Sequence, residues 1–155
     1  MIEIERKFLI LSLEFKDIAF AKIRMAQGYL NSDPERSVRV RIADERGWLT
    51  VKGKGNDSGT TRFEWEKEIP MTDALALLEL CENGVVEKFR YKVKIGSHIV
   101  EVDEFLGDND GLVVAEIELK NENEYFQKPD WLGVEVTGNP KYYNAAISKN
   151  PFKNW

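Results

Sequence analysis

The sequence is poor in the residues that build disulfide frameworks and soft-metal centres: its 155 residues include one cysteine and one histidine. A single cysteine excludes an intramolecular disulfide and a cysteine-based zinc site. Cys81 falls in an apolar run with helical spacing, so we expect it to be a buried structural thiol. His98 follows Gly96 and Ser97 in a predicted hairpin turn, where we expect a solvated side chain.

Long apolar runs are absent as well. No segment approaches the roughly 20 apolar residues that a membrane-spanning helix needs, and residues 1–10 mix charges into their apolar positions, unlike a signal peptide. We therefore expect a cytoplasmic protein with no membrane partner. Nor is there a basic excess, because 22 lysines and arginines face 27 acidic residues, giving a net charge of −5. Binding to a phosphate backbone generally needs such an excess, so we expect no nucleic-acid partner.

What the sequence has in abundance is alternation of apolar and polar residues with a period of two, which is typical of β-strands. The alternating segments are 2–10, 23–30, 38–42, 49–52, 62–69, 88–94, 100–103 and 115–119. Short loops rich in turn residues separate them and favour antiparallel pairing, and about eight strands can close a small barrel. The length suits one domain over residues 1–155.

Helices are few. Residues 71–83 have helical spacing, with Thr72 as the predicted N-cap and Gly84 as the stop. Three shorter helices are predicted over the ranges 12–22, 121–128 and 141–149. The helices are amphipathic, so they can cover the apolar faces of the strands. The polar faces would then point toward each other in a barrel lumen, or toward water in an open sheet.

The polar faces of the strands carry charges that are sorted by sign. Arg39 and Arg41 share one segment, and Lys88 and Arg90 share another. Carboxylates pair in four other segments: Glu3 with Glu5, Glu64 with Glu66, Glu101 with Asp103, and Glu116 with Glu118. A half-exposed sheet also alternates apolar and charged residues, but it can mix the two signs freely within a strand. The sorting therefore favours a cationic wall facing an anionic wall.

Two such walls suit a triphosphate bound together with divalent cations. Carboxylates at positions i and i+2 of a strand lie on one face, about 7 Å apart, and two opposed pairs can surround Mg²⁺ or Mn²⁺, which prefer oxygen ligands. Arginine forks and lysine ammonium groups bind phosphate oxygens. Phosphoryl transfer depends mainly on positioning, charge neutralisation and an aligned nucleophile, and a lumen lined in this way can supply all three.

The segment Glu3-Ile4-Glu5-Arg6-Lys7 is an E-x-E-x-K motif, and it resembles the signature of the triphosphate tunnel metalloenzymes, also called the CYTH superfamily. The rest of that family's pattern follows in order along nearly the whole chain. The matching segments are 39–41 (RVR), 50–53 (TVKG), 63–66 (FEWE), 87–91 (EKFRY), 101–105 (EVDEF), 115–118 (AEIE) and 135–142 (EVTGNPKY). The last segment resembles the closing part of the short bacterial members, the inorganic triphosphatase branch.

The resemblance implies a mostly-β (α+β) fold: a closed antiparallel eight-stranded β-barrel, or tunnel, with a few peripheral helices. The metal ligands it implies are Glu3, Glu5, Glu116 and Glu118, with Glu64 and Asp103 helping directly or through water. The phosphate-binding residues it implies are Arg39, Arg41, Lys52, Lys88, Arg90 and Lys141. For Lys141, a surface role is an equal alternative.

The resemblance also implies a catalytic pair. Gln27-Gly28-Tyr29-Leu30 resembles a segment of the tripolyphosphatase branch in which a tyrosine pairs with the signature lysine. Lys7 and Tyr29 are therefore the expected pair beside the attacked phosphate. Ordinary strand packing is the alternative explanation for Tyr29.

We therefore predict a metal-dependent inorganic triphosphatase that hydrolyses tripolyphosphate, with Mg²⁺ or Mn²⁺ as cofactor and a small-molecule triphosphate as partner. One cation neutralises the phosphate chain, and a second orients the attacking water. The alternatives are a class IV adenylate cyclase, in which a ribose hydroxyl replaces water, a thiamine or nucleoside triphosphatase, and a non-catalytic binder of polyphosphate or nucleotides. The sequence leaves open the physiological substrate, the preferred metal and whether the chain forms a homodimer.

Overall fold

The computed structural model describes residues 1–82 and 84–155. Strands dominate the chain, as the period-two alternation predicts. The strands are β1 (Ile2–Ile10), β2 (Ala21–Asn31), β3 (Arg36–Ala43), β4 (Arg46–Gly55), β5 (Thr61–Ile69), β6 (Val86–Ile95), β7 (His98–Phe105), β8 (Val113–Glu118) and β9 (Leu132–Glu135). The helices are α1 (Phe15–Ile18), α2 (Met71–Glu79) and α3 (Asn144–Lys149), with the 3₁₀ turns η1 (Gly107–Asn109), η2 (Pro140–Tyr142) and η3 (Phe152–Asn154).

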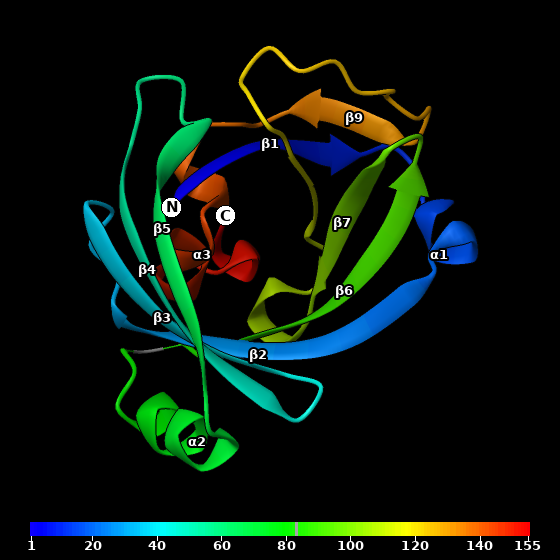
Figure 1. The fold of residues 1–155 in the computed structure, drawn as a ribbon. Coiled ribbons are helices and arrows are strands. Elements are labelled where there is room, and N and C mark those ends of the chain that lie inside the picture. Colours follow the sequence, from blue (N-terminus) through cyan, green and yellow to red (C-terminus); the bar gives the residue numbers. More distant parts are fainter. Residues whose placement is uncertain (83) are drawn as a thin grey trace.

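Eight of the strands close into an antiparallel barrel. Their hydrogen-bonded order is β5-β4-β3-β2-β6-β7-β8-β1, and pairing between β1 and β5 closes the ring. The short strand β9 pairs with the C-terminal end of β1, across an irregularity between Phe8 and Ile10. Seen end-on in Figure 1, the strands surround a central space, and α2 lies outside the ring. The predicted closed eight-stranded barrel is confirmed, and β9 is an addition that the alternation did not predict.

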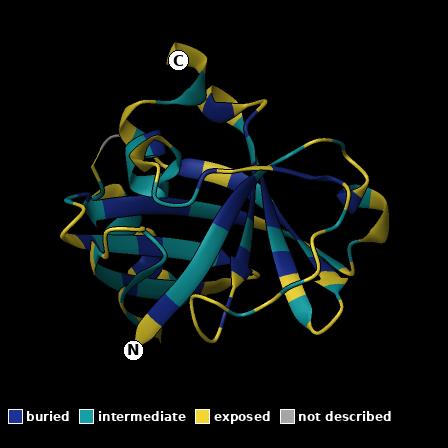
Figure 2. Ribbon diagram, turned by 90° about the horizontal axis from the view of Figure 1, so that it is seen from above, coloured by how far each residue is buried: buried dark blue, intermediate teal, exposed yellow. Residues whose placement is uncertain are grey.

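Each barrel strand alternates between side chains that face the lumen and side chains that face outward, so the two faces differ in chemistry. Outward-facing apolar residues of β1, β6, β7 and β8 form the main core, which α1 and the segment leading into β9 cover. Its fully buried members include Phe15, Val100, Val102, Ala115 and Ile117. Figure 2 shows the resulting alternation of buried and less buried residues along the strands.

A second apolar cluster fills one end of the barrel. Val86, Phe105 and Val114 come from β6, β7 and β8, and Ile147 of α3 packs against them and is fully buried. Each of the three strand residues is two positions from a charged residue of its strand that belongs to the polar face, so strand periodicity puts it on the lumen side. The helix α3 therefore lies across one end of the barrel.

Two short helices differ in extent from their predicted ranges. The helix α1 has four residues, whereas the prediction covered 12–22, because from Ala21 onward the chain pairs with β6 and belongs to β2. The prediction over 141–149 is confirmed in its second part by α3, while Lys141 lies in the preceding turn η2. None of the helices in the described part of the chain has the length and apolar character of a membrane span.

The helix α2 packs against β2, β3 and β4 and starts directly after Pro70. Thr72 therefore lies in the first turn, and its prediction as the N-cap is wrong. The helix ends at Glu79, earlier than predicted, and residues 80–82 are not helical. The predicted end at Asn83 lies outside the described residues.

The helix predicted over 121–128 is wrong, since the segment forms a turn followed by chain without regular secondary structure. Its acidic side chains reach two neighbouring loops instead. The carboxylate of Glu122 accepts a hydrogen bond from Thr60, and that of Glu124 contacts the imidazole of His98. These contacts with distant parts of the chain outweigh the local preference for helix.

The contact between α2 and β4 gives a test of the packing around the barrel. A Cβ added at Gly47 would lie 2.5 Å from the Cβ of the buried Ala74 on α2, so Gly47→Ala forces helix and strand apart. We expect this substitution to lower the free energy of unfolding by about 1–3 kcal/mol, measured by urea titration. Gly55→Ala, on the same strand, is the control, because a Cβ added there would lie 3.9 Å from its nearest neighbours. It should change the free energy of unfolding by less than about 1 kcal/mol. Equal losses in the two variants would contradict this packing.

Candidate active site

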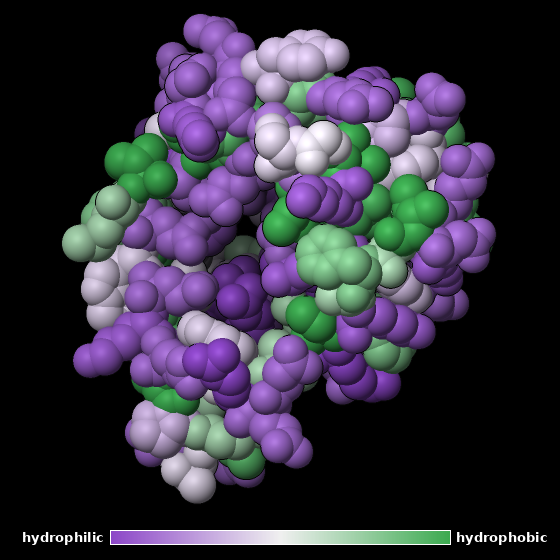
Figure 3. Space-filling model, turned by 45° about the vertical axis from the view of Figure 1, so that its right-hand side comes forward, coloured by the Kyte–Doolittle hydropathy of each residue, from purple (hydrophilic) through white to green (hydrophobic). Residues whose placement is uncertain are grey.

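A cavity of about 510 Å³ opens into the barrel lumen. Figure 3 shows the hollow, with hydrophilic residues around its opening. Among the described residues, the charged side chains that line it are nearly balanced in sign. The cations are Lys7, Arg39, Arg41, Lys52, Arg62, Lys88, Arg90 and Lys149, and the carboxylates are Glu3, Glu5, Glu64, Glu66, Glu101, Glu116 and Glu118. This balance lets most of the charges pair with one another inside the lumen.

Closing the barrel sorts these charges into two groups of neighbouring strands, an acidic arc and a basic arc. The strand order places β7, β8, β1 and β5 side by side, and these four strands carry the lining carboxylates. The other four strands, β4, β3, β2 and β6, carry Lys52, the two arginines of β3, Lys88 and Arg90. Lys7 and Arg62 are cations that stand within the acidic arc. The predicted cationic wall facing an anionic wall is therefore present, and the strand order produces it.

In the acidic arc, Lys7 bridges carboxylates of neighbouring strands. The register of β1 with β8 sets Glu5 opposite Glu118 and Lys7 opposite Glu116. The Nζ of Lys7 lies 3.8 Å from Glu5 and 3.6 Å from Glu116. Burial alone would lower the pKa of Lys7, but Glu116 and Glu5 outweigh burial and raise this pKa above its ordinary value. The ammonium group of Lys7 therefore stays charged in the lumen.

Glu118 shows that the acidic arc is short of positive charge. Burial raises its pKa, and the carboxylates of Glu3, Glu101 and Glu5 raise it further. Glu3 is itself engaged by Lys52, whose Nζ lies 2.9 Å away. In the described part of the chain, no three carboxylate, histidine or cysteine side chains are already gathered closely enough to hold a metal ion. The four main predicted metal ligands thus line one wall without forming a finished site.

In the basic arc, Arg39 and Arg41 are held in place by an ion pair, but not all of their hydrogen-bond donors have acceptors. One guanidinium nitrogen of each lies 3.6 Å from Glu66, and the Nε of each is buried with no hydrogen-bond partner among the described residues. Burial, together with the neighbouring Arg39, lowers the pKa of Arg41 to about 10. Buried donors without acceptors are costly, so this pair is suited to binding the oxygens of an anion in the lumen.

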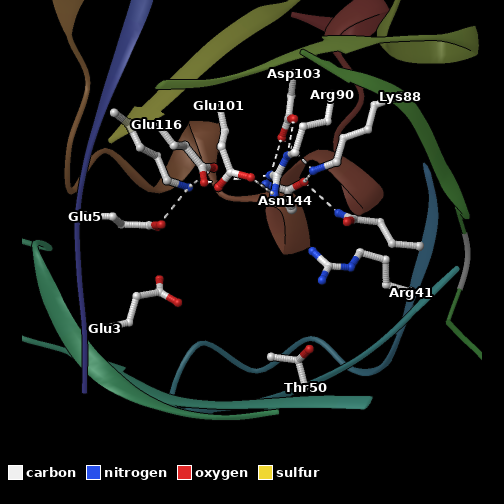
Figure 4. A network of polar contacts seen from close by, with 12 residues as sticks. Glu3, Glu5, Arg41, Thr50, Lys88, Arg90, Glu101, Asp103, Glu116 and Asn144 are labelled. Atoms are coloured by element: carbon white, nitrogen blue, oxygen red, sulfur yellow. Dashed lines mark hydrogen bonds and ion pairs between the residues drawn. The ribbon is translucent and has the colours of Figure 1, made fainter. Parts of the chain in front are cut away.

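At the inner end of the lumen, Asp103 ties two cations together (Figure 4). Its Oδ2 lies 2.7 Å from the Nζ of Lys88, and the guanidinium of Arg90 donates to its two oxygens at 2.7 and 2.9 Å. All three side chains are buried. Burial lowers the pKa of Lys88 to about 8. Burial alone would raise the pKa of Asp103, but Arg90 and Lys88 outweigh it and hold this pKa well below its usual range.

The predicted site residues line the cavity, with the exception of Asp103 and Lys141. Asp103 lies behind Lys88 and Arg90 with both of its oxygens engaged, so its position suits holding these cations in place better than ligating a metal. Lys141 is exposed, and its Nζ lies 4.1 Å from the ring centroid of Trp155. That position agrees with the surface role that the sequence left as an alternative.

The cavity is also lined by residues that the sequence did not assign to the site, among them Arg62, Asn144 and Lys149. Arg62 shares its strand face with Glu64, so its lumen position could have been found from the alternation in β5. Asn144 and Lys149 belong to α3. The place of this helix across the barrel end is set by tertiary packing, which leaves no local signal in the sequence.

The chain belongs to the CYTH domain family, whose sequence profile matches residues 1–150. An inorganic triphosphatase of Acetivibrio thermocellus is 50% identical over 154 residues, which cover 99% of this chain and 97% of that protein. An inorganic triphosphatase of Nitrosomonas europaea is 34% identical over 153 residues, covering 96% of this chain and 97% of that protein. A crystal structure of an inorganic triphosphatase matches the fold with a TM-score of 0.63 at 30% identity, over 94% of this chain and 97% of that one. These findings confirm the predicted family.

Removing the charge of Asp103 would leave Lys88 and Arg90 as buried cations without their main partner. We therefore expect Asp103→Asn to lower the free energy of unfolding at pH 7 by about 3–5 kcal/mol, measured by urea titration. Because the pKa of Asp103 is lower in the folded than in the unfolded state, its stabilisation is complete above the unfolded pKa and is lost as the pH falls. The difference between variant and wild type should therefore shrink in acid.

The control for this substitution is Glu101→Gln, which removes a more exposed partner of Arg90. It should lower the free energy of unfolding by much less, because water already screens this carboxylate. If the two variants were equally destabilised, Asp103 would not be the centre of the buried network.

Proposed function

We propose that this chain is a metal-dependent inorganic triphosphatase that hydrolyses tripolyphosphate inside the barrel lumen. One observation carries the proposal: Arg39 and Arg41 offer buried Nε donors that have no hydrogen-bond partner among the described residues, on the side of the ring opposite to a carboxylate-lined wall. A phosphate chain supplies acceptor oxygens to the arginines, and a divalent cation bound to the same chain suits the carboxylates. The relatives named above are inorganic triphosphatases, one of them 50% identical over nearly the whole chain, which supports the same reaction.

The residues that would hold Mg²⁺ or Mn²⁺ are Glu3, Glu5, Glu116 and Glu118, with Glu64 beside them. The raised pKa of Glu118, which comes from burial and from neighbouring carboxylates, supports this fit because a bound cation relieves such crowding. Donor sets made of carboxylate oxygens suit hard cations. The bound ion supplies charge neutralisation for the phosphate chain and orientation of the attacking water.

The cations of the substrate-free lumen are engaged by carboxylates. Lys52 lies 2.9 Å from Glu3, and Lys7 lies near two carboxylates of the acidic arc. A phosphate chain competes for these cations, so its binding frees carboxylates for the metal. Metal binding and phosphate binding should therefore strengthen each other. The phosphate-binding residues in this scheme are Arg39, Arg41, Lys52, Lys88 and Arg90.

The proposed catalytic pair is Lys7 and Tyr29. They line the cavity from β1 and β2, strands at opposite positions in the ring, and both side chains are buried. Burial raises the pKa of Tyr29 above its ordinary value, so its hydroxyl stays neutral and can donate a hydrogen bond. We place the pair at the attacked phosphate, where the ammonium of Lys7 stabilises the charge that develops in the transition state.

A substrate panel separates this function from the alternatives. Purified protein is incubated with tripolyphosphate, ATP and thiamine triphosphate, each with Mg²⁺ or Mn²⁺, and the products are identified. Orthophosphate released mainly from tripolyphosphate supports the proposal. Cyclic AMP with pyrophosphate identifies a class IV adenylate cyclase, and preferential release from thiamine triphosphate or ATP identifies another triphosphatase. The absence of any product identifies a non-catalytic binder.

Glu5 and Glu118 face each other between β1 and β8, so removing either charge should disable the metal site. We expect Glu5→Gln and Glu118→Gln each to abolish Mg²⁺-dependent phosphate release from tripolyphosphate, with thermal melting curves that show an intact fold. Glu68→Gln removes an exposed carboxylate that pairs with Arg46 away from the cavity and is the matched control. Full activity in both lumen variants would rule out the metal assignment.

The charge of Lys7 should matter more for turnover than for substrate binding. We expect Lys7→Met to lower kcat for tripolyphosphate by about 10²–10³-fold, with a smaller change in KM, measured by steady-state phosphate release. Tyr29→Phe removes only the hydroxyl group and should lower kcat by a smaller factor. Lys94→Met, at an exposed position of β6, is the control and should leave both constants unchanged. An unaltered kcat in Lys7→Met would remove Lys7 from the catalytic set.

A further inference from the structure

The helix α3 is part of the cavity wall as well as a plug for the barrel end. Ile147 is buried in the apolar cluster at that end, while Ala145 and Lys149 line the cavity. The backbone of α3 also packs tightly against the segment before β6, since a Cβ at Gly84 would collide with the carbonyl oxygen of Ser148. Apolar and steric contacts that do not involve Asn144 therefore hold α3 in place.

Asn144, the first residue of α3, makes side-chain hydrogen bonds between this helix and the barrel strands β2 and β6. Its Oδ1 accepts hydrogen bonds from the Nε2 of Gln27 at 2.6 Å and from the Nζ of Lys88 at 3.1 Å, and Figure 4 shows Asn144 beside Lys88. An ammonium group only donates, so the Asn144 atom that faces it must be the oxygen. The Gln27 atom that faces this oxygen must then be its NH₂ group. Lys88 thus fixes the orientation of both amides.

The same contacts fix the direction of the Lys88 ammonium group. It carries three N–H donors, of which Asp103 takes one at 2.7 Å and Asn144 takes another at 3.1 Å. The two acceptors come from different elements, β7 and α3, so together they leave the group little freedom to rotate. The third N–H remains for the cavity, which Lys88 lines.

We propose that Asn144 is a positioning residue for phosphate binding: by accepting a hydrogen bond from Lys88, it aims the remaining N–H of Lys88 at a phosphate oxygen in the lumen. This inference rests on the proposed function. Without the acceptor on α3, the Nζ of Lys88 is held by Asp103 alone, and its free donors lose their direction. Affinity for the phosphate chain then falls. The chemical step is preserved, because the side-chain hydrogen bonds of Asn144 among the described residues go to Gln27 and Lys88 and not to the proposed catalytic pair.

A role for Asn144 limited to anchoring α3 predicts a different result. In that case its hydrogen bond with Gln27 would matter as much as its hydrogen bond with Lys88. Gln27→Met removes the first bond with little change in side-chain volume and leaves the second. Ser148→Ala removes a hydrogen bond within α3, from the Ser148 hydroxyl to the carbonyl oxygen of Ala145. These two substitutions are the matched controls for Asn144→Ala.

The test measures the Kd for tripolyphosphate by isothermal titration calorimetry in metal-free buffer, and KM and kcat for tripolyphosphate with Mn²⁺. We expect Asn144→Ala to raise both Kd and KM about tenfold, the size of one hydrogen bond to a charged group, and to leave kcat within about twofold. Gln27→Met and Ser148→Ala should keep Kd and KM within about threefold of wild type. In a Lys88→Met background, Asn144→Ala should not change Kd further, because the two residues act as one unit.

An unchanged Kd in Asn144→Ala, an equal rise in Gln27→Met, or an undiminished effect in the Lys88→Met background would each overturn the proposal. If the alanine variant does not fold, Asn144→Ser gives the same comparison, since its shorter side chain withdraws the oxygen from Lys88. The metal-free Kd also separates this inference from the proposed function. Wild-type protein that binds tripolyphosphate but releases no phosphate with Mn²⁺ overturns the function alone, and wild-type protein that neither binds it nor releases phosphate from it with Mn²⁺ overturns both.

Discussion

The pairing of Asp103 with Lys88 and Arg90 is the interaction on which the lumen depends. Moving a charge from water into a protein interior costs several kcal/mol, and only close, well-oriented partners offset that cost. The inner end of this barrel is sealed by α3 and an apolar cluster, so the two cations there have little water to solvate them. Asp103 engages both cations with its two oxygens, and this allows the basic arc to extend to the sealed end of the barrel.

The same principle operates with looser contacts toward the open part of the cavity. There Lys7 and the arginines of β3 lie 3.6 to 3.8 Å from carboxylate oxygens, while Lys52 lies 2.9 Å from both oxygens of Glu3. The buried Nε groups of the two arginines have no hydrogen-bond partner in the described part of the chain. These contacts keep the charges in the lumen, and other ligands can replace them. A phosphate chain offers acceptor oxygens that can replace the carboxylates, and a divalent cation can take over the carboxylates that are released. In the proposed function, the inner network thus serves as a fixed base, and the outer pairs are the ones that substrate and metal exchange.

Strand positions and lumen chemistry could be predicted because period-two alternation reports directly which side chains share a face. The role of Asp103 could not be predicted, since in the sequence it stands two positions from Glu101 and resembles the other acidic residues spaced in this way. Only the register that sets Asp103 opposite Arg90 shows which cations engage it. The positions of α3 and β9 were even harder to predict. Asn144 reaches the lumen because Ile147 anchors α3 in the barrel end, a tertiary contact with no local periodicity, and β9 is too short for its alternation to stand out.

The central claim is that one lumen binds a phosphate chain and a divalent metal by exchanging its internal ion pairs for both ligands. The most direct test is a crystal structure of the protein with Mn²⁺ and a methylene-bridged tripolyphosphate analogue that resists hydrolysis. We predict that anomalous scattering locates Mn²⁺ on the acidic arc, at Glu3, Glu5 and their β8 neighbours, and that Lys52 has left Glu3 to contact a phosphate oxygen. Mn²⁺ bound elsewhere, or an analogue outside the lumen with the Lys52–Glu3 pair intact, would contradict the claim.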